Sequence, residues 1–154
     1  MILFGFKGCG KSHFGKLLAA KLHLPFIDTD ELLGGSPSHL YRTLGETRFR
    51  MLEKEALLTL QSGCVIALGG GTVLDPSNVE LLLKIGKLIY LEASFETIAR
   101  RIKITPAFAE GTSLHTLYQA RKPIYESILA HRIDTDALSE SGVLARLCDL
   151  CYFR

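Results

Sequence analysis

The sequence lacks an apolar run long enough to cross a membrane. Lys84, Lys87 or glycines interrupt its most hydrophobic stretches, well before the ~20 apolar residues that a helical span requires. Met1 is followed directly by a strand-like segment, where a secretory signal peptide would have a charged start and a longer apolar core. We therefore expect a cytoplasmic protein that has no membrane partner.

The sequence also has little excess charge of either sign. Its 154 residues include 18 Lys plus Arg and 16 Asp plus Glu, a net charge of +2. They form no basic stripe or tail that would bind a nucleic acid. Hydrophobic residues make up 47% of the chain, which excludes disorder and suffices for a core. Because no repeat or linker is visible, we expect a single domain over residues 1–154, acting as a monomer.

Patterns typical of transition-metal sites are equally scarce. Of the four cysteines, only Cys148 and Cys151 form a C-x-x-C pair, and the second pair that a structural zinc site requires is missing. We interpret these two as small buried residues of a C-terminal helix. The five histidines are not spaced as ligands, so we assign no transition metal to them: His13, His23, His39, His115 and His131.

Short apolar runs alternate with longer helical patterns, which predicts an α/β fold with a five-stranded parallel sheet and crossover helices. The expected strands are Ile2–Phe4, Phe26–Asp28, Cys64–Leu68, Leu88–Glu92 and Ile133–Thr135. The expected helices are Lys11–Leu22, His39–Gln61 with a break near Gly45, Pro76–Lys84, Phe95–Lys103, Leu114–His131 and Ser139–Cys151 with Ser139 as its N-cap. Residues 104–113 are expected to form a loop.

A glycine-rich segment links the first strand to the first helix. Residues 5–12 read GFKGCGKS, a full match to G-x-x-x-x-G-K-[ST] in the strand–loop–helix setting that this motif requires. Backbone N–H groups of such a loop surround an anion, while the lysine reaches the outer phosphates and the serine hydroxyl binds Mg²⁺. Because both pattern and flanks fit, a chance glycine-rich turn is disfavoured. The candidate nucleotide-binding residues are Gly8, Cys9, Gly10, Lys11, Ser12 and His13.

Two acids follow the second strand, at the edge of the sheet where open α/β folds bind their ligands. Asp28 and Asp30 are spaced so that both side chains point the same way. One can support the Mg²⁺ through water while the other accepts a proton from an attacking hydroxyl. Both residues can equally be N-caps for the segment after Glu31, and the pattern alone does not separate the two interpretations.

Two arginines and a triple glycine suggest an anionic second substrate. Arg50 and Glu53 lie at i and i+3 of one expected helix, and a surface pair of this kind contributes only about 0.2–0.5 kcal/mol. An arginine held rigid by a glutamate is better explained as a fork for a carboxylate or phosphate, and Arg121 is a second candidate. The glycines at 69–71 would let a ligand contact bare backbone, although a plain strand-to-helix turn is the alternative.

Taken in order, these segments resemble the shikimate kinase family over almost the whole chain: residues 5–12, Asp28-Thr29-Asp30, Gly45-Glu46…Phe49-Arg50…Glu53, Gly69-Gly70-Gly71, and Arg121…Pro123-Ile124-Tyr125. The resemblance implies a P-loop NTPase fold, with an acceptor-binding region near residues 31–60 and a lid near 102–113. It also implies that ATP and Mg²⁺ convert shikimate to shikimate 3-phosphate in the chorismate pathway of aromatic amino acid synthesis.

The resemblance also assigns roles to residues of this chain. It implies that shikimate is held by Asp30, Arg50, Gly70, Gly71 and Arg121. It further implies that Asp28 supports the Mg²⁺ site with Ser12, that Glu53 orients Arg50, and that Arg101 lies near the adenine. Lys11 and Asp30 are the candidate catalytic residues, with Asp30 acting as base or as aligner of the hydroxyl.

One departure from the family concerns the lid. Family members have an arginine before a proline there, whereas this chain has Thr105-Pro106. Lys103 is a candidate substitute, although lysine does not form a bidentate fork, and Lys7 can add positive charge near the phosphates. We expect an active kinase with an altered lid. The alternatives are a gluconate kinase-like enzyme and a nucleotide-binding homologue with weak or no turnover.

Overall fold

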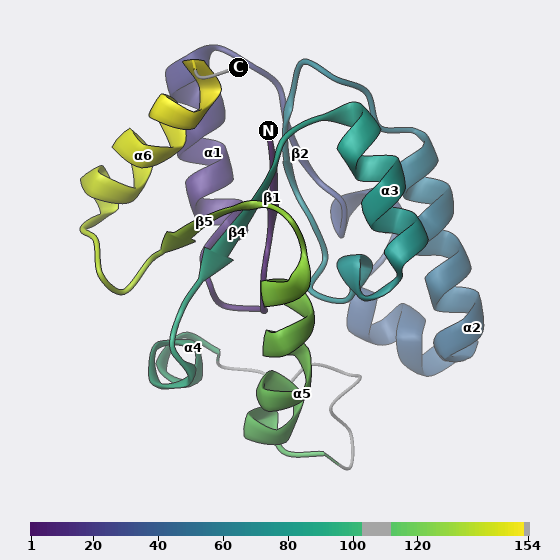
Figure 1. Cartoon of the computed structure of the whole chain (residues 1–154). Coiled ribbons are helices and arrows are strands. Elements are labelled where there is room, and N and C mark those ends of the chain that lie inside the picture. Colours follow the sequence, from purple (N-terminus) through teal and green to yellow (C-terminus); the bar gives the residue numbers. More distant parts are fainter. Residues whose placement is uncertain (103–111, 153–154) are drawn as a thin grey trace.

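The computed structural model describes residues 1–102 and 112–152. Its strands form one five-stranded parallel sheet in the order β2-β3-β1-β4-β5 (Figure 1). The strands are β1 (Ile2–Phe4), β2 (Phe26–Asp28), β3 (Val65–Ala67), β4 (Leu88–Glu92) and β5 (His131–Asp134). The predicted fold class is confirmed, and three of the five strands have the predicted bounds.

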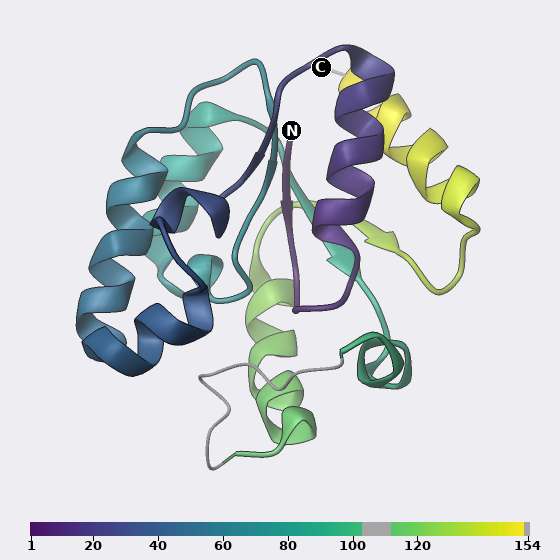
Figure 2. The same ribbon diagram turned by 180° about the vertical axis from the view of Figure 1, so that it is seen from behind.

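Helices cover both faces of the sheet. Figure 2 shows α1 and α6 in front of the sheet, and the opposite view in Figure 1 shows α3 and α5 in front. Two short 3₁₀ turns follow β2 and β3, namely η1 (Glu31–Leu33) and η2 (Thr72–Leu74). The helices are α1 (Lys11–Leu22), α2 (Pro37–Leu58), α3 (Pro76–Ile85), α4 (Phe95–Arg101), α5 (Leu114–Ser127) and α6 (Glu140–Tyr152).

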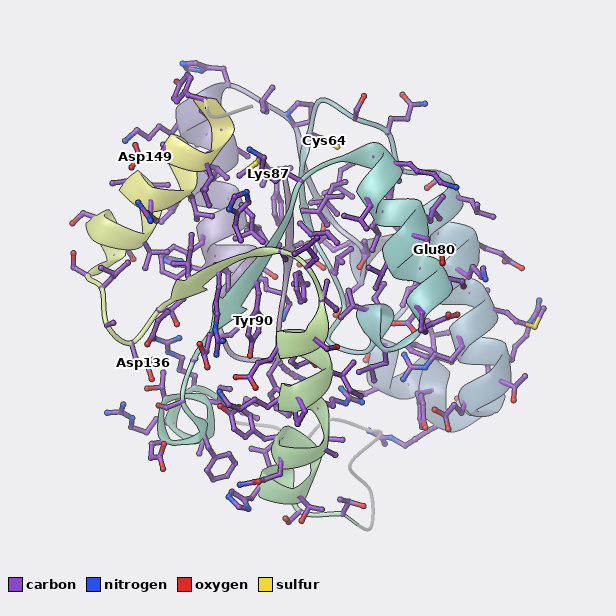
Figure 3. The ribbon with its side chains drawn as sticks, in the orientation of Figure 1. Cys64, Glu80, Lys87, Tyr90, Asp136 and Asp149 are labelled. Carbon is purple, nitrogen blue, oxygen red and sulfur yellow. The ribbon has the colours of Figure 1, made fainter. Side chains whose placement is uncertain are left out.

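The central strands are buried on both faces, as expected of a parallel sheet between two helical layers. All three residues of β1 have no exposed surface. The ring of Phe4 stacks on Tyr90 of β4, with centroids 5.4 Å apart. Tyr125 of α5 packs against both rings, and Tyr90 lies beside α5 near the middle of the molecule in Figure 3. This aromatic cluster fixes α5 on the sheet.

Helix α2 is bent at Gly45, as its sequence predicts. Gly45 has φ 75° and ψ 167° inside an otherwise helical segment, a conformation that glycine adopts without a Cβ clash. The first part of α2 therefore turns away from the second (Figure 1). The helix begins at Pro37, where proline suits the first turn, rather than at the predicted His39.

The predicted helix Leu114–His131 is too long. It ends at Ser127, Ile128 has an extended conformation, and His131 already belongs to β5. The short apolar run between helix and strand fits either period, so the pattern alone did not place the boundary. The helix predicted over Phe95–Lys103 is also too long, because α4 ends at Arg101 and Ile102 has an extended conformation. The loop predicted over 104–113 lies largely outside the described residues.

Both cysteines of the C-x-x-C pair lie on the predicted C-terminal helix, but only one of them is fully buried. Cys148 and Cys151 belong to α6, where Cys148 is buried and Cys151 is partly buried, and both are free. Burial raises the pKa of the Cys151 thiol, which lowers its thiolate fraction. In the described ranges, no helix combines the length and the apolar character needed to cross a bilayer.

Gly5, at the end of β1, provides a stability test. Its φ is +145°, and a Cβ there would overlap the carbonyl oxygen of Leu91. We expect Gly5→Ala to lower the free energy of unfolding by about 3 kcal/mol, since backbone strain of about 1 kcal/mol adds to a clash of about 1–3 kcal/mol.

Gly63→Ala is the matched control, measured like Gly5→Ala by urea unfolding. Gly63 also has a positive φ, +87°, but apart from its two chain neighbours no atom of the described residues lies within 4 Å of the Cβ position. We expect this variant to lose only the strain contribution of about 1 kcal/mol. Equal losses in the two variants would contradict the close approach at Leu91.

Candidate active site

A cavity of about 630 Å³ opens at the carboxyl ends of β1, β2 and β3, the edge where α/β sheets bind ligands. The P-loop, the segment after β2, the first part of α2 and the glycines after β3 form its walls. The lining residues are Lys7, Gly8, Gly10, Lys11, Ser12, His13, Asp28, Asp30, Ser36, Pro37, Ser38, Arg42, Phe49, Glu53, Leu68, Gly69, Gly70 and Gly71.

Lys11 is held inside the P-loop. Only 8% of this residue is exposed, and its Nζ donates to the carbonyl oxygens of Gly5 and Phe6, both at 2.9 Å. The residue begins α1, whose positive dipole end faces the loop. Lysine and helix terminus together make this turn an anion-binding site.

The residues expected to hold Mg²⁺ lie together. The hydroxyl of Ser12 donates to Asp28 Oδ2 at 2.6 Å, while Asp28 Oδ1 accepts from the backbone N–H of Asp30 at 3.1 Å. A hydroxyl and a carboxylate are oxygen donors of the kind Mg²⁺ prefers, and Mg²⁺ is commonly held by few protein ligands plus water and substrate phosphates. The donor set therefore fits this ion.

Asp30 points toward the triple glycine rather than capping a helix. It precedes η1, and its side chain makes no capping hydrogen bond there. A Cβ on Gly69 would lie 2.7 Å from Asp30 Oδ1. The N-cap interpretation is therefore wrong for Asp30. Its carboxylate therefore lines the cavity next to the triple glycine.

The pKa of Asp30 is raised above its ordinary value of 3.8, first by burial and then by the charge of Asp28. The ammonium groups of Lys11 and Lys7 oppose this rise, and Glu53 adds to it. A half-buried carboxyl with a raised pKa beside cations is typical of a group that exchanges a proton with substrate.

Arg50 and Glu53 of α2 form the predicted ion pair, and the carboxylate of this pair is buried. Glu53 is only 7% exposed, and it also accepts a hydrogen bond from the hydroxyl of Thr72 at 3.4 Å. The guanidinium of Arg50 stacks on the ring of Phe49 at 5.6 Å. These contacts fix the direction of the guanidinium, as the resemblance to the family implies.

The triple glycine brings backbone against these charged groups. A Cβ on Gly71 would lie 2.5 Å from Arg50 Nη1, a distance that real Cβ atoms do not adopt. A Cβ on Gly70 would lie 3.9 Å from Arg121 Nη1. A strand-to-helix turn alone does not explain the close approach at Gly71, whereas the distance at Gly70 is an ordinary van der Waals contact. Gly71 thus leaves room for the guanidinium of Arg50, and Arg121 lies next to Gly70.

Arg121 comes to the site from α5 and is 6% exposed. Burial lowers the pKa of its guanidinium, and a hydrogen bond with the side chain of Tyr125 opposes this effect. The Tyr125 hydroxyl donates to the Gly70 carbonyl at 2.6 Å, and burial raises its pKa to about 12. Sequence reasoning gave Tyr125 no role, although it lies one helical turn after Arg121.

An ion-pair network on the other side of α5 holds this helix to the sheet. Glu92 of β4 accepts from Lys122 at 2.5 Å and from Arg132 of β5 at 2.6 and 2.7 Å. Glu126 contacts the same two cations. The hydrogen bonds from Arg132 are the main reason that the pKa of Glu92 is lowered. The network restricts α5 and therefore the position of Arg121.

Arg101 and His13 border a second cavity of about 360 Å³ next to the P-loop. Arg101 Nη1 donates to the carbonyl oxygen of Gly8 at 3.3 Å. His13 Nε2 lies 2.6 Å from Glu140 Oε2 at the start of α6. The structure thus brings both candidate nucleotide-binding residues to one side of the loop.

Four residues of the cavity wall were predicted only as part of the acceptor-binding region near residues 31–60. Ser36, Pro37, Ser38 and Arg42 precede the Gly45 bend and line the cavity, because the bend directs this part of α2 across its mouth. The sequence predicted the break but not its direction. The lid candidates Lys103, Thr105 and Pro106 lie outside the described residues.

The fold and the site together define a P-loop kinase. The model of the shikimate kinase family matches residues 7–151. A curated shikimate kinase of Thermus thermophilus is 40% identical over 160 residues, covering 96% of this chain and 86% of that protein. The chain belongs to the shikimate kinase family.

Solved structures agree with this assignment. The shikimate kinase of Bacteroides thetaiotaomicron superimposes with a TM-score of 0.83 at 25% identity, covering 99% of this chain and 97% of that one. The shikimate kinase of Acinetobacter baumannii in complex with shikimate gives a TM-score of 0.80 at 25% identity, covering 97% and 90%. A gluconokinase of Sinorhizobium meliloti is similar at 0.62 and 18% identity, which supports the common fold alone.

The raised pKa of Asp30 predicts a gain in stability when its charge is removed. A carboxylate whose folded-state pKa is raised destabilises the fold at pH values above that pKa. We expect Asp30→Asn to have a larger free energy of unfolding than the wild type at pH 7. The gain should shrink as the pH falls through the raised pKa, because the wild-type carboxyl then becomes neutral.

Urea unfolding at pH 7 and pH 5 measures this effect. Glu80→Gln is the control, since Glu80 is an exposed carboxylate on α3 (Figure 3), outside the cavity. A loss of stability in Asp30→Asn at pH 7, or a gain that does not change with pH, would contradict the burial of the charge.

Proposed function

We propose that this chain transfers the γ-phosphoryl group of ATP to a hydroxyl of shikimate, giving shikimate 3-phosphate and ADP. The observation that carries this proposal is the convergence of two arginines on the triple glycine, beside the cavity that contains the P-loop. Arg50 and Arg121 reach Gly71 and Gly70 from different helices. Membership of the shikimate kinase family supports the assignment.

The arginines bind the carboxylate of the acceptor. A planar guanidinium recognises a carboxylate through two parallel hydrogen bonds, and a fixed orientation lowers the entropic cost of binding. Glu53 and Phe49 hold Arg50, whereas Tyr125 contacts Arg121. Backbone at Gly70 and Gly71 lets the ring of the acceptor approach closely, with its hydroxyl directed toward Asp30.

Transfer proceeds when the acceptor hydroxyl attacks the γ-phosphorus in line with the leaving oxygen of ADP. Asp30 accepts the hydroxyl proton or aligns the hydroxyl, and its raised pKa favours proton acceptance. Lys11 and the N–H groups of the P-loop neutralise charge on the phosphates, so that positioning and electrostatics supply most of the rate.

We assign the cofactor Mg²⁺ to Ser12 and Asp28, with nucleotide phosphates completing its coordination. Bound there, Mg²⁺ neutralises phosphate charge and orients the terminal phosphates. The nucleotide further contacts Gly8, Cys9, Gly10 and His13, with Arg101 near its base. In the described ranges, no cluster of three or more His, Cys, Asp or Glu side chains forms a metal site.

The domain organisation, oligomeric state and location of the chain are also part of the proposal. We propose one domain over residues 1–154, with an acceptor region near 31–60 and a lid near 102–113, most of which lies outside the described residues. We also propose a cytoplasmic monomer, since one chain supplies every site residue described above. The alternative of a nucleotide-binding homologue without turnover rests on Thr105 at the position of the family's lid arginine, which lies outside the described residues.

The decisive experiment incubates purified protein with ATP, Mg²⁺ and shikimate and follows ADP and phosphorylated product by ³¹P NMR. We expect stoichiometric ADP and shikimate 3-phosphate, and no turnover with gluconate, which lacks the ring. Binding of both ligands without product would support the nucleotide-binding homologue and overturn the proposal.

Truncating either arginine tests the acceptor site. A hydrogen bond to a charged group contributes about 1.5–3 kcal/mol. Arg50→Ala and Arg121→Ala should therefore each raise the KM for shikimate about 10- to 100-fold, since about 1.4 kcal/mol corresponds to tenfold. The KM for ATP should change less than twofold.

Steady-state kinetics with each substrate varied in turn gives both constants. Arg48→Ala is the control, because Arg48 is an exposed arginine of the same helix and residues two apart do not share a helix face. Equal losses for both substrates would indicate that Arg50 and Arg121 are structural instead.

A further inference from the structure

The P-loop has a second lysine, Lys7, whose position differs from that of Lys11. Its neighbours Phe6 and Cys9 are buried, with 3% and 0% exposure, whereas Lys7 is exposed and lines the 630 Å³ cavity. The two lysines of the loop therefore have different surroundings. Lys11 occupies its inside, and Lys7 faces the cavity.

The backbone of Lys7 lies against the acceptor side of the site. Its nitrogen is 3.5 Å from the point where a Cβ on Gly70 would be, and Arg121 Nη1 lies 3.9 Å from the same point. Lys7 is therefore attached to the donor loop at the place where that loop meets the acceptor glycines. A side chain of this length reaches the space between the two substrates.

The ionic surroundings of Lys7 agree with this placement. The cavity is also lined by the acids Asp28, Asp30 and Glu53 and by the cations Lys11 and Arg42. Lys7 and Asp30 therefore border the same cavity, with Asp30 next to Gly69 and the backbone of Lys7 next to Gly70.

We infer that Lys7 is a further catalytic residue, whose ammonium contacts the transferring phosphoryl group between the P-loop and the acceptor at Gly70 and Arg121. This inference rests on the proposed function. In the step, the bond from phosphorus to the leaving oxygen of ADP breaks, the bond to the acceptor oxygen forms, and the hydroxyl proton passes to Asp30 or solvent. Lys7 stays protonated and stabilises charge on the phosphoryl oxygens.

Lys7→Met tests the inference, because methionine keeps much of the length and removes the charge. We expect kcat to fall at least tenfold, with the KM for shikimate within twofold of the wild type. Calorimetry with Mg²⁺ should show at least fivefold weaker binding of a non-hydrolysable ATP analogue, but ADP binding within twofold. ADP lacks the phosphate that Lys7 contacts, so its binding also shows that the variant is folded.

Two further variants sharpen the result. Lys7→Arg keeps the charge and should recover most of kcat, whereas Lys21→Met removes an exposed charge at the far end of α1 and should leave every constant unchanged. A kcat of Lys7→Met within twofold of the wild type, or equal weakening of the analogue and ADP, would overturn the inference. Where even the wild type does not phosphorylate shikimate, the proposed function fails, and the analogue-to-ADP ratio still decides the phosphate contact.

Discussion

The contact between Arg50 and the glycines after β3 is the constraint on which the rest of the site depends. Glu53 is nearly inaccessible to solvent, and a buried carboxylate without a partner is strongly destabilising. Arg50 satisfies Glu53, and Gly71 is the residue that leaves room for its guanidinium. The pair therefore fixes how closely α2 approaches the sheet. The distance between α2 and the sheet in turn sets the width of the cavity between α2 and the P-loop.

Positive charge is concentrated at the site, although the net charge of the whole chain is small. The net charge is only +2, yet cations from three separate elements border the acceptor side. Arg121 is buried at a cost to its ionisation, and Asp30 is half-buried with a raised pKa. Such costs are typical of functional sites, where groups are arranged for chemistry at the expense of stability. The ion pairs around Glu92 and the aromatic cluster under α5 hold these groups in place.

Much of this arrangement was predictable from the sequence, because the local patterns agree with the fold. The P-loop match placed Lys11 and Ser12, and the strand end placed Asp28 beside them. Other features depend on tertiary packing and were missed. The pattern of charges identified Arg50 but not the burial of its partner, and the hydrogen bond from Tyr125 to Gly70 joins residues 55 positions apart. The hydrophobic pattern also predicted the break at Gly45 but did not predict the direction in which the helix bends.

The most direct test of this account compares shikimate with its methyl ester as acceptors. The ester keeps the ring and the hydroxyls but loses the negative charge that two arginines are built to bind. We expect kcat/KM for the ester to be at least 100-fold below that for shikimate in the wild type, and the ratio to approach one when both Arg50 and Arg121 are replaced by alanine. Equal kcat/KM values for the two acceptors in the wild type would contradict the account.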